Sequence, residues 1–310
     1  MQLTVQHEAA IDYAETARLA TEAFASPDVS FSPERLRWLY DVSFSHGTTV
    51  LSLFAGAQKA GQVALVHQAV RVEGRAERAV MLSDLFILKP FRSRAAITDL
   101  YGEVERFCTA QAIRFILAVP NEKATPVNIR YLKLAPFIRM AVRVGLSIPF
   151  ARSDVASQGL AGLGRDKAAA LLDRYVRASD AGLSWTGESL WSRFSDSSRA
   201  FAVHASDDVL VISAARVSSH VPHTLIFAIL VHEGIEATRR DVARVIAAAC
   251  AWHGRPVFVY AGMNRRIALP GWACPDRLRP SPMTLQIRDF SPESGPVSFD
   301  RFELLDFDFA

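Results

Sequence analysis

Hydrophobic and polar residues alternate with a period of two in three runs of the first 90 residues. The runs 49–55, 61–70 and 79–88 are rich in Val, Leu, Ile and Phe, and short polar turns separate them. Alternation of this kind is typical of half-buried strands, and turns this short favour antiparallel hairpins. We therefore expect a three-stranded antiparallel unit near the start of the chain.

A helical period surrounds this unit. Leu100, Val104, Phe107 and Cys108 recur at a spacing that places them on one helix face. Serine and proline at 32–33 fit the cap and first position of an earlier helix. The other elements expected in the first half are a helix over 9–24, a strand over 114–119, a helix within 121–134 and a strand over 139–148.

The second half repeats this order of elements. Trp38 and Trp191 are 153 residues apart, and Cys108 and Cys250 are 142 apart. We interpret these matched offsets as a tandem duplication with small deletions. The repeated elements are strands over 200–205, 208–217, 223–232, 256–261 and 283–287, with a helix through Val242, Ile246 and Cys250.

A segment rich in Gly, Ser and Ala separates the two halves and begins near residue 151. We expect a first domain over residues 1–150, a linker over 151–165 and a second domain over 166–310. A length of 310 residues agrees with two domains of ordinary size. The fold class expected is α/β (α+β), with a mixed, mostly antiparallel sheet flanked by helices in each domain.

Charge and composition exclude several classes of protein. The chain is 50% hydrophobic and 22% charged, which excludes a disordered protein. With 35 basic and 32 acidic residues, the net charge of +3 lacks the strong basic excess of a dedicated nucleic-acid binder. We expect no nucleic-acid partner.

Three cysteines are too few and too scattered for a disulfide framework or a thiolate metal site. We therefore expect no metal. The sequence contains neither an apolar run of about 18 residues nor a signal-peptide pattern at its start. A cytoplasmic protein without a membrane partner is expected, and the sequence leaves its oligomeric state open.

The stretch LSDLFILKPFRSRAAITDLYGEVERF, at 82–107, resembles the core motif of the GNAT (GCN5-related N-acetyltransferase) superfamily. That motif is a strand, an R-x-x-G-x-G loop and a helix. Further on, PNEKATPVNIRYLKLAPF is similar to the later signature of that family, in which an asparagine precedes a helix with Tyr-x-Lys-Leu. The resemblance covers about 55 residues clearly and implies a tandem GNAT protein.

The resemblance implies that acetyl-CoA, or another acyl-CoA, is the co-substrate. A loop that leads into a helix presents free N–H groups and the positive end of the helix dipole, which suits a pyrophosphate. Ala95 and Ile97 stand where the family has glycines. Ala95 adds a methyl group, and Ile97 would crowd the approach of the anion if its side chain faced inward. By their match to the motif, the cofactor-binding candidates are the strand residues Phe86, Ile87 and Leu88, the loop residues Arg92, Ser93, Arg94, Ala95, Ala96 and Ile97, and Asn121.

The resemblance also supplies two catalytic candidates. Tyr131 matches a tyrosine that acts in the family as a general acid toward the leaving thiolate, although a half-buried structural tyrosine is equally common. Asp84, among Leu82, Leu85 and Phe86, is the candidate base, because apolar neighbours raise the pKa of a carboxyl. If Asp84 packs beneath the loop, its role is structural. Asn121 also fits the cap of the next helix.

The equivalent loop of the second half, HEGIEATRRD, places Glu233 and Glu236 where a pyrophosphate needs donors. We therefore expect the first half to bind the cofactor and the second to brace it. The function expected is an acyl-CoA-dependent N-acyltransferase acting on a small-molecule or peptide amine. The alternative is a degenerate GNAT-fold protein that binds a ligand or partner between its domains.

Overall fold

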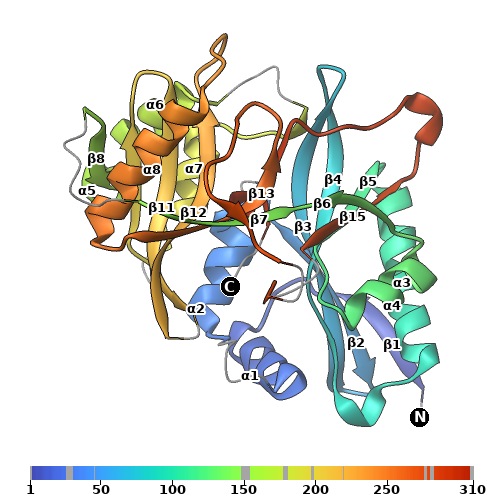
Figure 1. Cartoon of the computed structure of the whole chain (residues 1–310). Helices are drawn as coiled ribbons and strands as arrows, with labels where there is room; N and C mark the ends of the chain where they lie inside the picture. The colour runs from blue at the N-terminus through green and yellow to red at the C-terminus, as the bar shows by residue number, and fades with distance from the viewer. Residues whose placement is uncertain are drawn as a thin grey trace.

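The computed structural model of the chain describes residues 2–25, 31–44, 46–147, 154–176, 181–196, 199–218, 220–275, 278–279 and 283–307. Within these residues the strands form one continuous hydrogen-bonded sheet, and helices flank it (Figure 1). Most pairings are antiparallel. The expected mixed α/β class, with a mostly antiparallel sheet and flanking helices, is confirmed.

The three alternating runs form β2 (Thr48–Ala55), β3 (Gln58–Val72) and β4 (Arg75–Ile87), which pair as antiparallel hairpins. The remaining elements of the first half are β1 (Leu3–His7), α1 (Tyr13–Phe24), α2 (Pro33–Arg37), a π-helical turn (Trp38–Ser43), a 3-10 turn (Lys89–Phe91), α3 (Arg94–Ala110), β5 (Phe115–Ala118), α4 (Ala124–Leu132), β6 (Ala135–Arg139) and β7 (Ala141–Leu146).

Local signals in the sequence set the helix starts. The hydroxyl of Ser32 accepts a hydrogen bond from the N–H of Arg35, and Pro33 begins α2, as predicted. The helix expected over 9–24 begins later, at Tyr13, because the carboxylate of Asp12 caps it through the N–H of Glu15. The residues before it include β1, which the hydrophobic pattern does not predict.

The second half repeats the antiparallel hairpins and the helix that follows them, but among its described residues no helix follows the next strand as α4 follows β5 in the first half. The segment expected as a linker, 151–165, contains a short strand and a short helix, while the domain division itself stays a prediction. The elements are β8 (Ala156–Gly159), α5 (Leu160–Leu163), α6 (Arg165–Asp173), β9 (Gly182–Leu183), α7 (Gly187–Phe194), β10 (Phe201–Ala205), β11 (Val209–Ser218), β12 (Val221–Val231), α8 (Arg239–His253), β13 (Val257–Asn264), β14 (Trp272–Ala273), β15 (Thr284–Asp289), β16 (Arg301–Glu303) and 3-10 turns at Pro292–Ser294 and Leu304–Asp306.

The two halves exchange a strand. β15, encoded near the end of the chain, lies between β5 and β6 in the sheet of the first half and pairs antiparallel with both. β7, encoded in the first half, pairs antiparallel with β13 of the second half. Gly145 allows this second pairing, since a Cβ there would lie 2.3 Å from the ring of Phe258. Each half therefore completes the sheet of the other.

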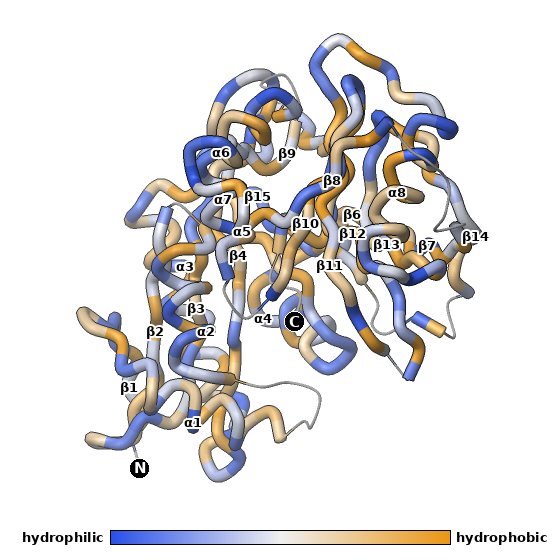
Figure 2. Tube along the Cα trace, turned by 90° about the vertical axis from the view of Figure 1, so that its left-hand side faces the viewer, coloured by the Kyte–Doolittle hydropathy of each residue, from blue (hydrophilic) through white to orange (hydrophobic). Residues whose placement is uncertain are grey.

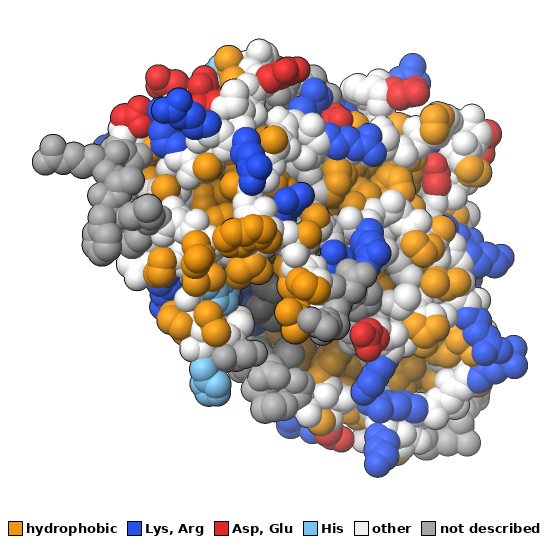
Figure 3. All heavy atoms as spheres, in the orientation of Figure 1, with side chains coloured by type: hydrophobic (Ala, Val, Ile, Leu, Met, Phe, Trp, Pro, Cys, Tyr) orange, Lys and Arg blue, Asp and Glu red, His pale blue; other side chains and the backbone are white. Residues whose placement is uncertain are grey.

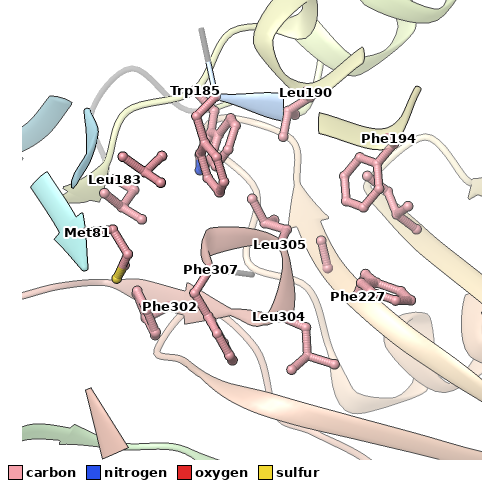
Figure 4. Packing of buried hydrophobic residues seen from close by; sticks show 14 of the residues in the cluster. Met81, Leu183, Trp185, Leu190, Phe194, Phe227, Phe302, Leu304, Leu305 and Phe307 are labelled. Carbon is pink, nitrogen blue, oxygen red and sulfur yellow. The ribbon is translucent and has the colours of Figure 1, made fainter. Parts of the chain in front are cut away.

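Two short strands join the sheets into one. β9 pairs with β3 through Val70 and Leu183 and with β16 through Arg301 and Gly182, and β16 pairs with β13. Hydrophobic residues recur along strands of both halves, such as β3 and β12 (Figure 2). One buried cluster holds Met81 of β4 together with Phe227 of β12 and residues near the C-terminus (Figure 4). The halves consequently share a core.

Arg193 of α7 fixes the junction between the halves. Its side chain is buried, with 4% exposed, and its guanidinium donates to Ser43 Oγ at 2.9 Å and to the carbonyl oxygens of Leu305 at 2.9 Å and Phe307 at 2.6 Å. The rings of Trp38 and Phe44 lie 5.3 and 4.8 Å from the guanidinium carbon. One buried cation thus holds the first half, α7 and the C-terminal segment together.

We predict that Arg193→Met lowers the free energy of unfolding by about 2–4 kcal/mol, because three buried acceptors lose a charged donor. Urea denaturation followed by tryptophan fluorescence measures this loss. Arg165→Met is the matched control, because Arg165 pairs with Glu188 at the surface, where both side chains are at least half exposed, and its loss costs under about 1 kcal/mol. Equal losses in the two variants would contradict the role of Arg193.

Candidate functional site

A cavity opens where β4 and β5 diverge. Their parallel pairing covers only Ala79–Met81 and Phe115–Leu117, after which β5 ends and β4 continues to Ile87. Beyond Met81, the edge of β4 that faces β5 has no ladder partner among the described strands. The cavity has a volume of about 450 Å³, and residues of β4, α2 and the connection from β5 to α4 line it. This volume suits a small ligand.

Asp84 lies in this cavity at a β-bulge of β4. Two residues, Asp84 and Leu85, stand opposite the single residue Val63 of β3. The backbone of Asp84 has a φ of +46°, in the left-handed region that aspartate tolerates better than most side chains. Bulges of this kind redirect a side chain and bend the strand. The bulge therefore turns β4 at the point where it leaves β5.

A chain of hydrogen bonds from Gln62 through Tyr40 holds the carboxylate of Asp84. The hydroxyl of Tyr40 donates to Asp84 Oδ2 at 2.7 Å and accepts from Gln62 Nε2 at 3.2 Å. Both supporting side chains are buried, with 1% and 0% exposed. Within the described residues, Gln62 Oε1 has no hydrogen-bond partner. Tyr40 does not stand out in the sequence as a site residue, because its pattern is that of any core tyrosine on a helix.

The strand residues Phe86, Ile87 and Leu88 lead from the bulge to the loop. Phe86 and Leu88 bury their side chains against α1, and the N–H of Leu88 donates to the carbonyl of Ala60 at 2.8 Å. Ile87 packs on the cluster that includes Ala60. Their pairing with β3 uses one edge of the strand. The other edge faces the opening between β4 and β5.

The loop after β4 ends in the capped start of α3. Ser93 is the N-cap, and its hydroxyl accepts from the N–H of Ala96 at 3.1 Å. Arg94 and Ala95 are exposed at the first two helical positions, and Ala96 is buried against β2. Ile97 packs toward the cluster between α3 and the sheet. Its side chain therefore does not cover the N-terminus of the helix.

Arg92 connects this loop to the end of α1. Its Nε donates to the carbonyl of Ile87 at 2.7 Å, and its Nη2 donates to the carbonyl of Ala23 at 3.0 Å. The adjacent Phe24 lines the cavity. Arg92 thus fixes the loop relative to one wall of the cavity.

Asn121 and Asn128 lie on the opposite wall. Asn121 is exposed at the cavity, and its side-chain oxygen accepts from the N–H of Ala124 at 2.9 Å, so it caps α4. Asn128 is buried and accepts from the hydroxyl of Tyr101 at 2.5 Å, while its amide donates to Gln286 of β15 at 3.1 Å. Burial raises the pKa of Tyr101 well above its usual value. The exchanged strand therefore positions a residue of the cavity wall.

Tyr131 lies beside the cavity and is not part of its lining. It follows Ala124 and Asn128 by seven and three residues, which places it on the same face of α4, one turn further along. Its ring is half-buried and packs on the cluster that Leu82 and Leu85 also contact. The structure thus brings Asp84 and Asn121 into one cavity and leaves Tyr131 next to it.

The corresponding opening in the second half is filled. β12 and β13 pair in parallel over Thr224–Ile226 and Phe258–Tyr260 and then diverge. The C-terminal segment 299–307 occupies the space between them, and Phe302, Leu304 and Leu305 are buried there (Figure 4). A void of about 30 Å³ remains, roughly the share of one water molecule in the liquid.

The carboxylate of Glu303 anchors this segment. It is fully buried and accepts hydrogen bonds from the N–H of Ile229 at 3.2 Å, the hydroxyl of Tyr260 at 2.8 Å and the amide of Asn264 at 3.2 Å. Burial raises the pKa of Glu303 to about 6, although Arg301 at 3.2 Å opposes the shift. Both diverging strands thus bond to one side chain of the tail.

Two further features are absent from the described residues, a membrane-crossing helix and a metal-binding cluster. Of the helices in the described ranges, none combines the length and the hydropathy that a membrane crossing requires. Among the same residues, no cluster of three or more His, Cys, Asp or Glu side chains has the geometry of a metal site.

Comparison with solved structures places the fold. A protein of Enterococcus faecalis described as a probable N-acyltransferase matches 93% of this chain and 73% of its own, at 14% identity and a TM-score of 0.65. A GCN5-related N-acetyltransferase from Kribbella flavida matches 93% and 71%, at 14% identity and a TM-score of 0.60. Eis1 from Mycobacterium abscessus matches 92% and 72%, at 14% identity and a TM-score of 0.56.

No protein-family model matches the sequence. No curated protein matches it either. The similarity lies in the three-dimensional arrangement and extends over nearly the whole chain. The chain therefore has the fold of the GNAT N-acetyltransferases.

Proposed function

We propose that this protein is an acyl-CoA-dependent N-acyltransferase that transfers an acetyl group to an amine, with its active site in the first half. The observation that carries the proposal is the open cavity at the divergence of β4 and β5, with Asp84 at its bulge. The equivalent divergence in the second half is closed by the chain itself. We infer that the chain binds one acyl-CoA, in its first half.

The loop residues 92–97 are proposed to hold the pyrophosphate of the acyl-CoA. Ser93 caps α3 through Ala96, so the N–H groups of Arg94 and Ala95 remain at the positive end of a 17-residue helix. Ala95 adds one methyl group in place of the glycine of the family motif. Phe86, Ile87 and Leu88 are proposed to pair through their backbone with the pantetheine arm, along the edge of β4 that β5 leaves.

Basic side chains gather near this proposed binding site. Lys123, Arg130, Lys133 and Arg139 are exposed on and after α4. In Figure 3, Lys and Arg side chains collect at the lower right of the molecule, where Figure 1 shows α3 and α4. A positive field of this kind attracts a phosphate-bearing ligand and raises its rate of association.

Direct attack is the chemistry that these residues support. Asp84 is proposed to accept a proton from the ammonium form of the amine. The freed nitrogen then bonds to the thioester carbonyl carbon, the carbon–sulfur bond breaks, and the nitrogen loses its second proton to water. Tyr131 is proposed to give its proton to the departing thiolate from the neighbouring turn of α4. Tyr40 holds Asp84 by a 2.7 Å hydrogen bond, and its buried hydroxyl is a positioning group for the base.

The alternative is a GNAT-fold protein without catalytic activity, which binds a ligand or partner where its two halves meet. Ala95, which is exposed at the start of α3 in place of a motif glycine, favours this alternative. Phe307, from the tail that closes the second half, lines the cavity of the first half. Binding of acetyl-CoA and turnover separate the two functions.

We predict that acetyl-CoA stabilises the protein in a thermal unfolding assay. At about 100 times the Kd, binding adds about 2.7 kcal/mol, which raises the Tm of a chain of this size by about 4 °C. Ala95→Asp places a carboxylate where the pyrophosphate is proposed to bind. It should raise the Kd for acetyl-CoA at least tenfold, which corresponds to about 1.4 kcal/mol. The helix itself should remain stable, because an acidic residue in the first turn interacts favourably with the helix dipole.

Ala161→Asp is the matched control, since Ala161 is exposed at the second position of α5 as Ala95 is in α3. This variant should keep the full shift. If millimolar acetyl-CoA leaves the Tm of the unsubstituted protein unchanged, the acyl-CoA proposal fails.

We predict that Asp84→Asn and Tyr131→Phe each lower kcat by about 10²-fold or more, because each removes a group that moves a proton. Release of free thiol from acetyl-CoA, measured with the best amine of a panel of polyamines, amino sugars and peptides, follows turnover. The KM for acetyl-CoA should change little in either variant.

Tyr13→Phe is the control for the tyrosine, because the hydroxyl of Tyr13 bonds to Asp41 outside the cavity. A turnover rate for Tyr131→Phe equal to that of this control would remove Tyr131 from the mechanism. Acetyl-CoA binding without thiol release for any amine in the panel would favour the non-catalytic alternative.

A further inference from the structure

A second cavity lies at the other end of α3 from the proposed cofactor loop. It has a volume of about 520 Å³, and its lining includes His7 of β1, His46 before β2 and His67 of β3. Phe107 and Gln111, near the end of α3, close one side. Phe107 is 13 residues from the start of the helix, so this cavity is about 20 Å along α3 from the loop. We call it the histidine groove.

The three histidines come from segments far apart in the sequence, and two of them, His7 and His67, lie against one aromatic ring. The ring of Phe107 lies 6.0 Å from that of His7 and 6.0 Å from that of His67. His67 also bonds to the hydroxyl of Thr49 through Nε2, at 2.9 Å. Three of the eight histidines of the chain thus share one groove that acyl transfer does not use.

The polar groups that the groove offers are mainly donors. Arg78 of β4 lines it, and its guanidinium also donates to the carbonyl of Gln111, which covers the negative end of α3. Glu77 is the acidic residue of the lining, and Arg114 neutralises it at 3.2 Å. Arg114 in turn pairs with Asp289 at 3.1 Å. With neutral histidines, Arg78 and Arg114 balance Glu77 and Asp289, so the groove gains an excess of positive charge when its histidines take up protons.

The side chain of Gln68 is an independent indication that the groove can bind an acceptor group. Its side chain is 8% exposed and lines the groove, and its Nε2 has no hydrogen-bond partner among the described residues. A buried amide that bonds to nothing costs about 1–3 kcal/mol, so such groups are rare in folded proteins. An acceptor atom placed in the groove would satisfy this donor.

We propose that the histidine groove is a second ligand site, which binds a small organic carboxylate with an apolar body. The carboxylate oxygens accept from Arg78, Gln68 and the imidazole N–H groups. The apolar body packs on Phe107 and on the alanines 69, 76 and 79 of the lining. A divalent metal ion fits less well, because the guanidinium of Arg78 repels it.

Binding should strengthen as the pH falls. Burial lowers the pKa of His67, and the positive charges of Arg78, His46 and His7 lower it further. A bound anion opposes this charge repulsion and favours protonated imidazoles, so proton uptake accompanies binding. The other charged group that faces the histidines, Glu77, is already paired.

Histidine side-chain NMR on the whole chain tests the site, with benzoate as the probe. Benzoate should shift the signals of His7, His46 and His67 and leave the other five histidines unchanged, with a Kd in the millimolar range. The Kd should be several-fold lower at pH 6 than at pH 8. Arg78→Gln should weaken binding about tenfold, and Gln68→Leu should weaken it several-fold.

Arg75→Gln is the matched control, because Arg75 is exposed on the same strand outside the groove, and its affinity for benzoate should equal that of the unsubstituted protein. Inorganic phosphate should bind more weakly than benzoate; equal affinity would remove the apolar part of the proposal. Shifts caused by micromolar Zn²⁺ but not by benzoate would replace it with a metal site.

No shift of these three histidines at tens of millimolar benzoate would overturn the site altogether. Acetyl-CoA should leave their signals unchanged. Failure of the groove proposal therefore leaves the acyl-transfer proposal intact, and the converse also holds.

Discussion

The hydrogen bonding of strands that diverge is the constraint on which this structure depends. When two parallel strands separate, each exposes a backbone edge whose N–H and C=O groups need partners or water. In the first half, β5 receives β15 on its far side, and the edge of β4 stays open. In the second half, β13 receives both β7 and β16, and the tail fills the gap. The divergence of two parallel strands thus leaves a cavity in the first half and a packed core in the second.

The exchange of β7 and β15 makes each half necessary to the other. β5 has only four residues, and without β15 between it and β6 the wall behind the cavity would lose its ladder. Gln286 of β15 also bonds to Asn128, which lines the cavity. Arg193 adds a buried cation that binds both the first half and the tail. The shape of the first cavity is consequently set by residues from the whole chain.

The sequence predicts the fold where the physics is local. Alternation along 49–55 and 61–70 predicts β2 and β3, because each strand buries one face. Strand exchange is not predictable in this way, since β7 and β15 have hydrophobic patterns that suit either sheet, and the partner depends on the path of the chain. The turn at Asp84 has no local signal either, because a bulge arises from the register between two strands.

The site shows the same division between local and non-local causes. Asn121 caps α4 through contacts three residues away, and the sequence allowed for that role. Tyr40 and Asp84 are 44 residues apart, and only the packing of α2 and the turn that follows it on the sheet brings them together. Asn128 lines the cavity and Tyr131 does not, because Tyr131 lies about one turn further along the same face of α4.

Asp84 combines a strained backbone at the bulge with a hydrogen-bonded side chain at the cavity. A positive φ costs a non-glycine residue about 1–3 kcal/mol, and glycine would avoid that cost. Asp84 instead keeps a side chain that receives a 2.7 Å hydrogen bond from Tyr40, which is itself buried and bonded to Gln62. A hydrogen bond to a charged group contributes about 1.5–3 kcal/mol, enough to offset the strain. The strained backbone and the buried tyrosine therefore stabilise one arrangement, in which a carboxylate is held at the open edge of β4.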